Sequence, residues 1–259
     1  MLELPDSLPP GALTGASPEI FAGAAGASDC LWFHGRKDQF EVEGQIVRGW
    51  HALTGSREAL PTQPNAGNAV LAESEDRYGL QCQTGLHCGL SVAGALRSAA
   101  RFSMSVIYLP PPEAEARTLL TVNTGHSGGK DSDANYLFLS DGGDTYTIKD
   151  TKEALELSVP VAARPDGPRL ATVTMTGANL AFQENRGPIA RMTGSDPGMD
   201  AAAEFFIAAR SHRKGLQKTL GGGVILDVML WPNHTLLLPR GPEDIAQLQA
   251  LHRYFLWEY

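Results

Sequence analysis

The sequence predicts an all-β fold in which two antiparallel sheets form a sandwich that is closed by a C-terminal helix. Short β-like runs, separated by clusters of Gly, Pro, Asn or Asp, follow one another from Asp29 onward. The chain shows no regular alternation of strands and helices, and its last residues recur at helical spacing. Two sheets of about six or seven strands each would use this set of runs.

The stretch LGGGVILDVMLW, residues 220–231, is expected to be an interior strand. Both of its faces are largely apolar, which is typical of a strand that is covered on both sides. Strict alternation would place Val224, Leu226, Val228 and Leu230 on one face of the strand and Ile225, Asp227, Met229 and Trp231 on the other.

A helix over residues 242–257 is predicted to seal this sheet. Pro242 stands early in the segment, and Glu243 and Asp244 place two acids in its first turn. Apolar and aromatic residues then recur at helical spacing: Ile245, Leu248, Leu251, His252, Phe255 and Tyr259.

The two ends of residues 29–259 resemble laminin-G-like, concanavalin A-like jelly rolls. The opening DCLWFHGRKDQFEVEGQIVRGWHALTGS is similar to the family's Leu-Trp strand followed by a Val/Ile-x-x-Trp strand and a Ser/Thr-Gly turn, here Val47, Trp50, Thr54 and Gly55. The family often has an Asp where this chain has Ala52. The resemblance implies a jelly-roll sandwich with a C-terminal helix and says little about activity.

Length and composition predict one acidic domain with an N-terminal arm. The 259 residues fit a single all-β domain, and the formal net charge of −8 argues against nucleic acid as a partner. Residues 1–28, rich in Pro, Gly, Ala and Ser, are expected to be an anchoring arm. We found no signal for export and no membrane span, and we expect the three cysteines to be buried free thiols.

The chemistry is expected in the loop NTGHSGGKDSDAN, residues 123–135, and the neighbouring turn. A phosphate-binding loop is rejected because Thr124 stands where Gly is needed, and an EF-hand because Tyr136 stands at the turn glycine. Ca²⁺ binding by Asp131 and Asp133 in another geometry stays open, as does a plain surface loop. The candidate glycan-binding residues are His126, Lys130, Asp131, Asp133, Asn135, Tyr136, Asp144 and Tyr146.

No catalytic set is recognised in the sequence. Glycoside hydrolysis in this fold needs two carboxylates roughly 5 to 9 Å apart, and neither Glu41 with Glu43 nor Glu73 with Glu75 has the third acid of an E-x-D-x-x-E strand. The four tryptophans are expected in the core. The basic residues Arg210, His212, Arg213, Lys214 and Lys218 are an alternative contact site for an anionic polysaccharide or a protein.

These observations predict a non-catalytic module that binds cell-surface polysaccharide. The resemblance to a binding fold, without an export signal, favours synthesis in the cytoplasm and action outside on a released phage-like particle, as a spike whose arm, residues 1–28, anchors it to a capsid or tail protein. A homo-oligomer is left open. The alternatives are a polysaccharide-acting enzyme of the same fold, either a hydrolase or a lyase, and a structural virion subunit.

Overall fold

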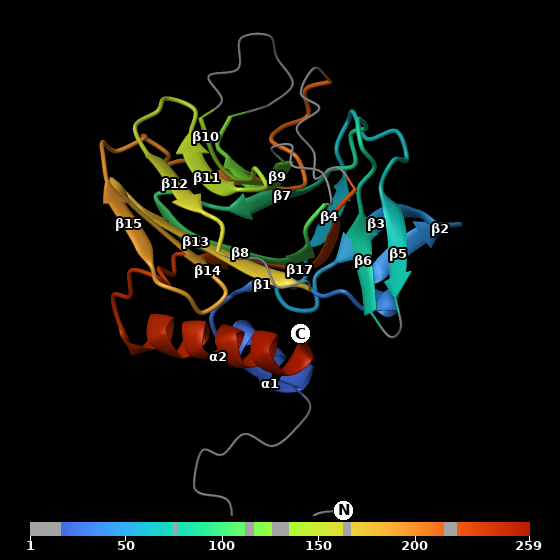
Figure 1. Ribbon diagram of the computed structural model, residues 1–259, viewed down its shortest axis with the longest axis horizontal. Helices are drawn as coiled ribbons and strands as arrows, with labels where there is room; N and C mark the ends of the chain where they lie inside the picture. The colour runs from blue at the N-terminus through green and yellow to red at the C-terminus, as the bar shows by residue number, and fades with distance from the viewer. Residues whose placement is uncertain (1–16, 75–76, 112–116, 126–134, 163–166, 215–221) are drawn as a thin grey trace, which may run out of the picture.

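The fold consists of antiparallel strands with two α-helices on one side (Figure 1). The computed structural model describes residues 17–74, 77–111, 117–125, 135–162, 167–214 and 222–259. The layer next to the helices, called here the helix-side layer, has the order β15-β14-β13-β8-β17. Its strands are β15 (Ala190–Thr193), β14 (Asn179–Glu184), β13 (Arg169–Thr176), β8 (Arg101–Leu109) and β17 (Val224–Pro232), and β1 (Leu31–Phe33) and β6 (Arg77–Gln81) pair with the other edge of β17.

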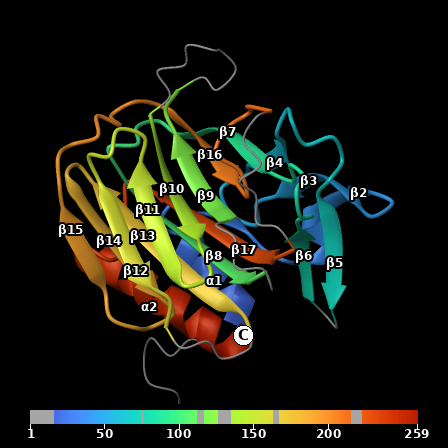
Figure 2. The same ribbon diagram turned by 45° about the horizontal axis from the view of Figure 1, so that its top comes forward.

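A second run of strands, called here the opposite layer, faces the first (Figure 2). Its order is β4-β7-β16-β9-β10-β11-β12. The strands are β4 (Glu58–Pro61), β7 (Leu90–Leu96), β16 (Ala203–Ile207), β9 (Arg117–Asn123), β10 (Tyr136–Asp141), β11 (Thr145–Asp150) and β12 (Glu156–Pro160). Beside both layers lie β2 (Phe40–Glu43), β3 (Ile46–His51) and β5 (Val70–Ser74), with a short 3₁₀ helix, Lys37–Gln39.

The prediction of an all-β antiparallel fold with a C-terminal helix is confirmed, but two separate sheets are not observed. Strand β4 pairs with β3 and with β7, so the hydrogen-bonded pairings run through all seventeen described strands as one sheet. The edge strands β12 and β15 also contact each other. The sheet therefore folds back on itself and nearly closes into a barrel.

Two apolar clusters hold this arrangement together. The larger one fills the space between the two layers and contains Trp50, Met104 and Phe205. The second lies between the helix-side layer and the helices and contains Trp32, Trp231 and Tyr254. Burial of three of the four tryptophans agrees with the sequence prediction, whereas Trp257 is 55% exposed and that prediction is wrong.

The C-terminal unit follows the sequence closely, with one difference in β17. Helix α2 spans Pro242–Glu258, as the proline and the two acids predict. In β17 the register shifts between Ile225 and Asp227, so Ile225 packs in the cluster between the layers together with Val228. A β-bulge adds one residue to a strand and reverses the alternation beyond it. The predicted division of the two faces is therefore wrong at the start of the strand.

The second half of the predicted arm packs on the domain. Ser17–Gly26 forms helix α1, which lies against α2 (Figure 1). Phe21 is 1% exposed; its ring stacks on Tyr254 with centroids 4.9 Å apart and meets Trp32 edge to face at 4.7 Å. The Ala- and Gly-rich sequence gave little sign of this helix because its order depends on contacts with distant residues. The anchoring role of residues 1–28 stays a prediction, and residues 1–16 lie outside the described part.

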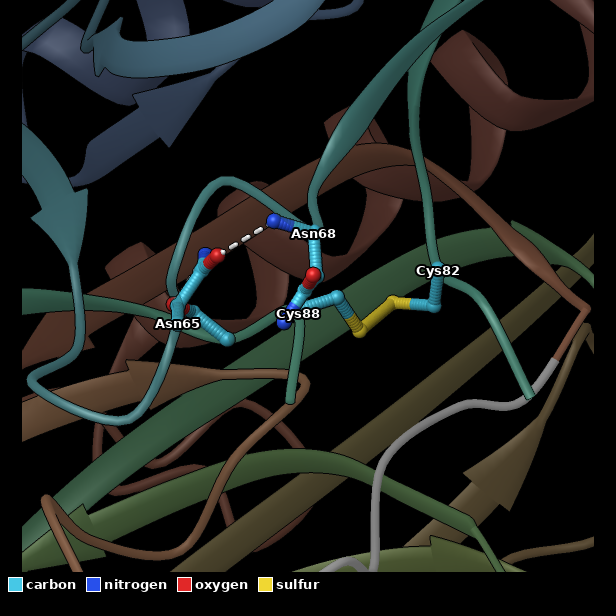
Figure 3. The surroundings of a disulfide bond; sticks show 5 residues. Asn65, Asn68, Cys82 and Cys88 are labelled. Carbon is cyan, nitrogen blue, oxygen red and sulfur yellow. Dashed lines mark hydrogen bonds between the residues drawn. A yellow bond between two sulfur atoms is a disulfide. The ribbon is translucent and has the colours of Figure 1, made fainter. Parts of the chain in front are cut away.

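The cysteines differ from the expectation of three free thiols. Cys30 is free and buried, but Cys82 and Cys88 form a disulfide (Figure 3). Cys82 follows β6 and Cys88 precedes β7, and their Cα atoms lie 5.3 Å apart. Beside the bridge, Asn65 accepts a hydrogen bond from the backbone N–H of Asn68 (Figure 3). The sequence shows only a six-residue separation, which does not reveal whether the two strand ends meet.

Within the described ranges, neither α1 nor α2 combines the length and the apolar character that crossing a bilayer requires.

Candidate functional site

A cavity opens on the outer face of the opposite layer, where β7, β16 and β9 lie side by side. Its volume is about 270 Å³, close to the lower end of the range of about 300–1,000 Å³ for ligand pockets. Glu204 of β16 and Asn123 of β9 are direct cross-strand partners, and both line the cavity. The other lining residues are Ala93, Gly94, Thr124, Gly125, Ala202 and Ala203.

Glu204 is held by a histidine from the turn that follows its own strand. His212 Nε2 lies 2.9 Å from Glu204 Oε1. The backbone N–H of Gln63 donates to His212 Nδ1 at 3.2 Å, so in a neutral ring Nδ1 is the acceptor and Nε2 carries the proton. His212 then donates to Glu204, which accepts as a carboxylate. The pair is partly exposed, with 18% of the His212 side chain and 22% of the Glu204 side chain accessible.

Arg210 places a fixed cation on the same outer face. Its guanidinium lies 3.4 Å from the centroid of the Phe138 ring, and Nε donates to Thr118 Oγ1 at 2.9 Å. Burial lowers the pKa of Arg210, an effect that the nearby Tyr136 partly offsets. Its backbone carbonyl accepts from Asn123 Nδ2 at 3.1 Å. The arginine is thus held between aromatic and hydroxyl groups, and it connects the β10 surface to the cavity.

The structure places four of the predicted glycan-binding residues. Asn135 is buried, Tyr136 is partly exposed at the start of β10, and Asp144 is exposed in the turn after it. Tyr146 is fully buried and lies inside the domain, so it cannot face a glycan as predicted. The remaining predictions, His126, Lys130, Asp131 and Asp133, lie outside the described residues, and with them the predicted Ca²⁺ ligands.

Tyr146 belongs to a polar cluster between the layers. Its hydroxyl donates to Glu184 Oε1 at 3.0 Å and lies 2.9 Å from the hydroxyl of Tyr108, which donates to Asp141 Oδ2 at 2.7 Å. Arg169 is within 4.0 Å of both carboxylates. Burial raises the pKa of both tyrosines, so their hydroxyls stay protonated at neutral pH. A protonated, enclosed phenol is a poor nucleophile, and the cluster is better explained as a connection between the layers.

A second buried carboxylate, Asp227, joins β17 to β1 and α2. It is fully buried and accepts hydrogen bonds from Trp32 Nε1 at 3.1 Å and Tyr254 OH at 2.7 Å. His34 Nδ1 lies 2.8 Å away. The backbone N–H of Gly35 and the hydroxyl of Tyr259 complete the set. Several donors around one buried carboxylate compensate for its lost hydration, so Asp227 is a structural group.

Sequence reasoning missed both Glu204 and Asp227 as important groups. Asp227 carried a usable signal, because an acid inside an otherwise apolar strand needs buried partners. Glu204 begins the apolar run EFFIAAR and His212 follows eight residues later. That spacing becomes informative only when the turn after β16 is known to bring the imidazole back.

Comparison with known proteins relates the chain to sialidase structures at the level of fold. Trypanosoma rangeli sialidase in complex with 2,3-difluorosialic acid matches with a TM-score of 0.55 and 15% identity, over 89% of this chain and 33% of the sialidase. The same enzyme with a related difluoro acid gives 0.53 and 14%, with the same coverage. The chain thus spans about a third of the length of these proteins. A Ruminococcus gnavus IT-sialidase CBM40 bound to sialyllactose gives only 0.39 at 16% identity, over 51% of this chain and 75% of that one.

No protein-family profile and no curated protein sequence matches the chain. The structural matches nevertheless correct the predicted function. The Trypanosoma rangeli structures, which match above a TM-score of 0.5, are sialidases, and sialidases are glycoside hydrolases. They contradict the prediction of a non-catalytic module and agree with its alternative, an enzyme of the same fold that acts on polysaccharides, whereas display on a phage-like particle stays a prediction. The resemblance to the laminin-G-like superfamily is supported only as an antiparallel β fold that occurs in carbohydrate-active proteins.

Proposed function

We propose that the chain acts on glycans as a glycoside hydrolase, and that Glu204 is a carboxylate of its active site. The observation that supports this most is the Glu204–His212 pair at the edge of the cavity, with the imidazole oriented by the backbone of Gln63. A carboxylate that accepts a hydrogen bond from an oriented imidazole is fixed in direction, which is a property that a glycosidase base or nucleophile needs.

Arg210 suits the same substrate. Its guanidinium lies on the Phe138 ring and donates to the buried hydroxyl groups of Thr118 and Ser140, and Asn123, which is 1% exposed, holds the Arg210 carbonyl. A guanidinium fixed in this way would pair with a sugar carboxylate. Sialic acid, the ligand of the matched sialidases, is one such acidic sugar.

Hydrolysis also needs an acid that protonates the departing oxygen. Within the described residues, Glu204 is the only acid that lines the cavity. We therefore propose Asp131 and Asp133, two sequence candidates that lie outside the described residues, as the acids to test for this role. Glu204 would then act as base toward water or as nucleophile at the anomeric carbon, while the aspartic acid transfers its proton to the leaving group.

The test is a hydrolysis assay of the whole chain on a panel of glycans. The panel includes an umbelliferyl sialoside, other aryl glycosides and acidic bacterial polysaccharides, with released reducing ends or fluorophore as the readout. We expect cleavage of at least one member. A folded protein that binds a panel glycan and cleaves none would overturn the proposal and restore a non-catalytic role.

The general acid can be identified by comparing substrates that differ only in their leaving group. Asp131→Asn and Asp133→Asn are compared on an activated aryl glycoside and on a sugar-linked substrate with the same glycone. Loss of the general acid should lower kcat strongly for the sugar leaving group, by about 10²–10⁴, and much less for the aryl group, which needs no protonation. Equal effects on both substrates would contradict the assignment.

A further inference from the structure

The structure assigns a divalent metal site to Glu41, His51 and Glu58, on the outer face of β2, β3 and β4 and separate from the Glu204 cavity. One ligand atom from each of the three side chains lies within 4.8 Å of the other two. The three strands are adjacent, since β3 pairs with β2 on one edge and with β4 on the other. One imidazole and two carboxylates, from three strands, form a set typical of zinc and related transition metals.

Strand register explains why the three side chains share a face. Glu41 pairs with Gly49, and His51 pairs with Glu58. Trp50 lies between Gly49 and His51 and points the other way, into the core, where it stacks on Phe40 with centroids 4.6 Å apart. The residues on either side of Trp50 therefore face outward, as alternation requires.

Gly49 provides the space in which the ligands meet. A Cβ atom at this position would lie 2.5 Å from Glu58 Oε1 and 3.4 Å from Glu41 Oε2. The two carboxylates thus converge above the one residue of the central strand that has no side chain. A side chain there would occupy the volume that an ion needs.

The distances and charges fit an ion. His51 Nδ1 and Glu58 Oε1 are 3.6 Å apart, too far for a good hydrogen bond. Two ligands each about 2.1 Å from a tetrahedral zinc ion lie about 3.4 Å from each other. Two carboxylates facing each other repel, and within the described residues no Lys or Arg forms an ion pair with Glu41 or Glu58. A divalent cation would neutralise both.

The imidazole selects the class of metal. Ca²⁺ and Mg²⁺ take oxygen ligands, whereas zinc, cobalt and nickel accept a histidine nitrogen together with carboxylates. The His51 side chain is 50% exposed and Glu58 35%, so a fourth position faces solvent and would take water. The ion would join β2, β3 and β4 at the place where the sheet passes from one layer to the other.

The proposal is tested with the whole chain, freed of metal by a chelator and titrated with Zn²⁺ or Co²⁺. We expect one equivalent to bind, a rise in melting temperature, and a visible Co²⁺ spectrum that His51→Ala changes. Glu58→Gln, His51→Ala and Gly49→Ala should each weaken the affinity at least tenfold. Gly49→Ala should still fold, since only the flexible end of Glu58 must move.

Glu43→Gln is the matched control. Glu43 is an exposed acid on the same strand β2 that pairs with Arg48, and its loss should leave Zn²⁺ affinity unchanged. The inference is overturned if the wild type does not bind Zn²⁺, or if the three variants bind as the wild type does. Binding of Ca²⁺ without Zn²⁺, abolished by Asp131→Ala with Asp133→Ala, would also overturn it.

Discussion

Asp227 and Glu204 are both carboxylates on strands, yet their surroundings assign them opposite roles. Asp227 is fully buried and receives donors from β1, α2 and the end of the chain. Glu204 is 22% accessible, has its orientation fixed by His212, and lines a cavity. Donors that enclose a carboxylate stabilise the fold, whereas an oriented carboxylate that remains accessible can meet a substrate.

Removing Asp227 should have the largest effect on stability. Asp227→Ala leaves the buried donors of Trp32 and Tyr254 without their acceptor, and we expect a loss of about 3–5 kcal/mol in the free energy of unfolding. Urea denaturation measures it. Glu204→Gln, in a partly exposed site, should lose less than about 1 kcal/mol. Equal losses in the two variants would remove the distinction between the carboxylates.

The second-largest loss of stability is expected for Phe21→Ala, which tests whether α1 stabilises the region around Asp227. Phe21→Ala should cost about 3 kcal/mol, because the ring packs on Trp32 and Tyr254, both of which donate to Asp227. Thermal unfolding measures the loss, and the control is a chain that lacks residues 1–16 but keeps α1. A neutral Phe21→Ala would mean that α1 does not contribute to the stability of this region.

The region around Asp227 shows which features could be predicted from the sequence. Local patterns predicted β17 and α2, since alternation, glycines, a proline at the helix start and acids in the first turn are contained in a few consecutive residues. Contacts between distant segments were not predictable. Examples are the contact of Phe21 with Tyr254, the Cys82–Cys88 bridge, and the passage of β4 between β3 and β7, which depend on which helices and strands meet.

In the candidate site, too, the sequence predicted what depends on local composition and missed what depends on contacts between distant residues. The sequence singled out the segment between Asn123 and Asn135. Asn123 lines the cavity, and the Asn135 carbonyl accepts from the backbone N–H of Thr124, which also lines it. It also selected Tyr146, which the pleat of β11 turns inward, and it missed Glu204, whose role depends on His212 and the backbone of Gln63. Loop composition thus selected a segment next to the proposed site, whereas the Glu204–His212 pair became visible only in three dimensions.

A smaller effect is expected from the disulfide, which lies in neither carboxylate region. Closing a loop of this length should contribute about 2 kcal/mol. A reductant should lower the stability of the wild type by that amount and leave the double variant Cys82→Ser with Cys88→Ser unchanged. A variant as stable as the oxidised wild type would show that the bridge adds nothing.

A still smaller stability effect than that of the disulfide is expected for Asp244 at the start of α2. Burial raises the pKa of this carboxyl, but hydrogen bonds from the Arg240 and Thr235 backbone N–H groups and from His234 outweigh it, and the net pKa lies below its usual value. Its contribution is therefore present above the unfolded pKa of about 3.9 and is lost as pH falls through the folded value. Asp244→Asn should cost about 1 kcal/mol at pH 7.

The pH dependence of that variant is its control. The difference between wild type and Asp244→Asn, measured by urea denaturation, should shrink below about pH 4. A difference that stays constant down to pH 2 would show that the carboxylate charge is not responsible.

The most direct test of the central claim compares Glu204→Gln with Glu156→Gln on a glycan that the wild type cleaves. Glu156 is an exposed acid on β12 of the same layer that pairs with Lys149. Loss of the active-site carboxylate should lower kcat by at least about 10², while Glu156→Gln keeps the wild-type rate and both variants melt within about 4 °C of the wild type. Wild-type turnover by Glu204→Gln would contradict the account.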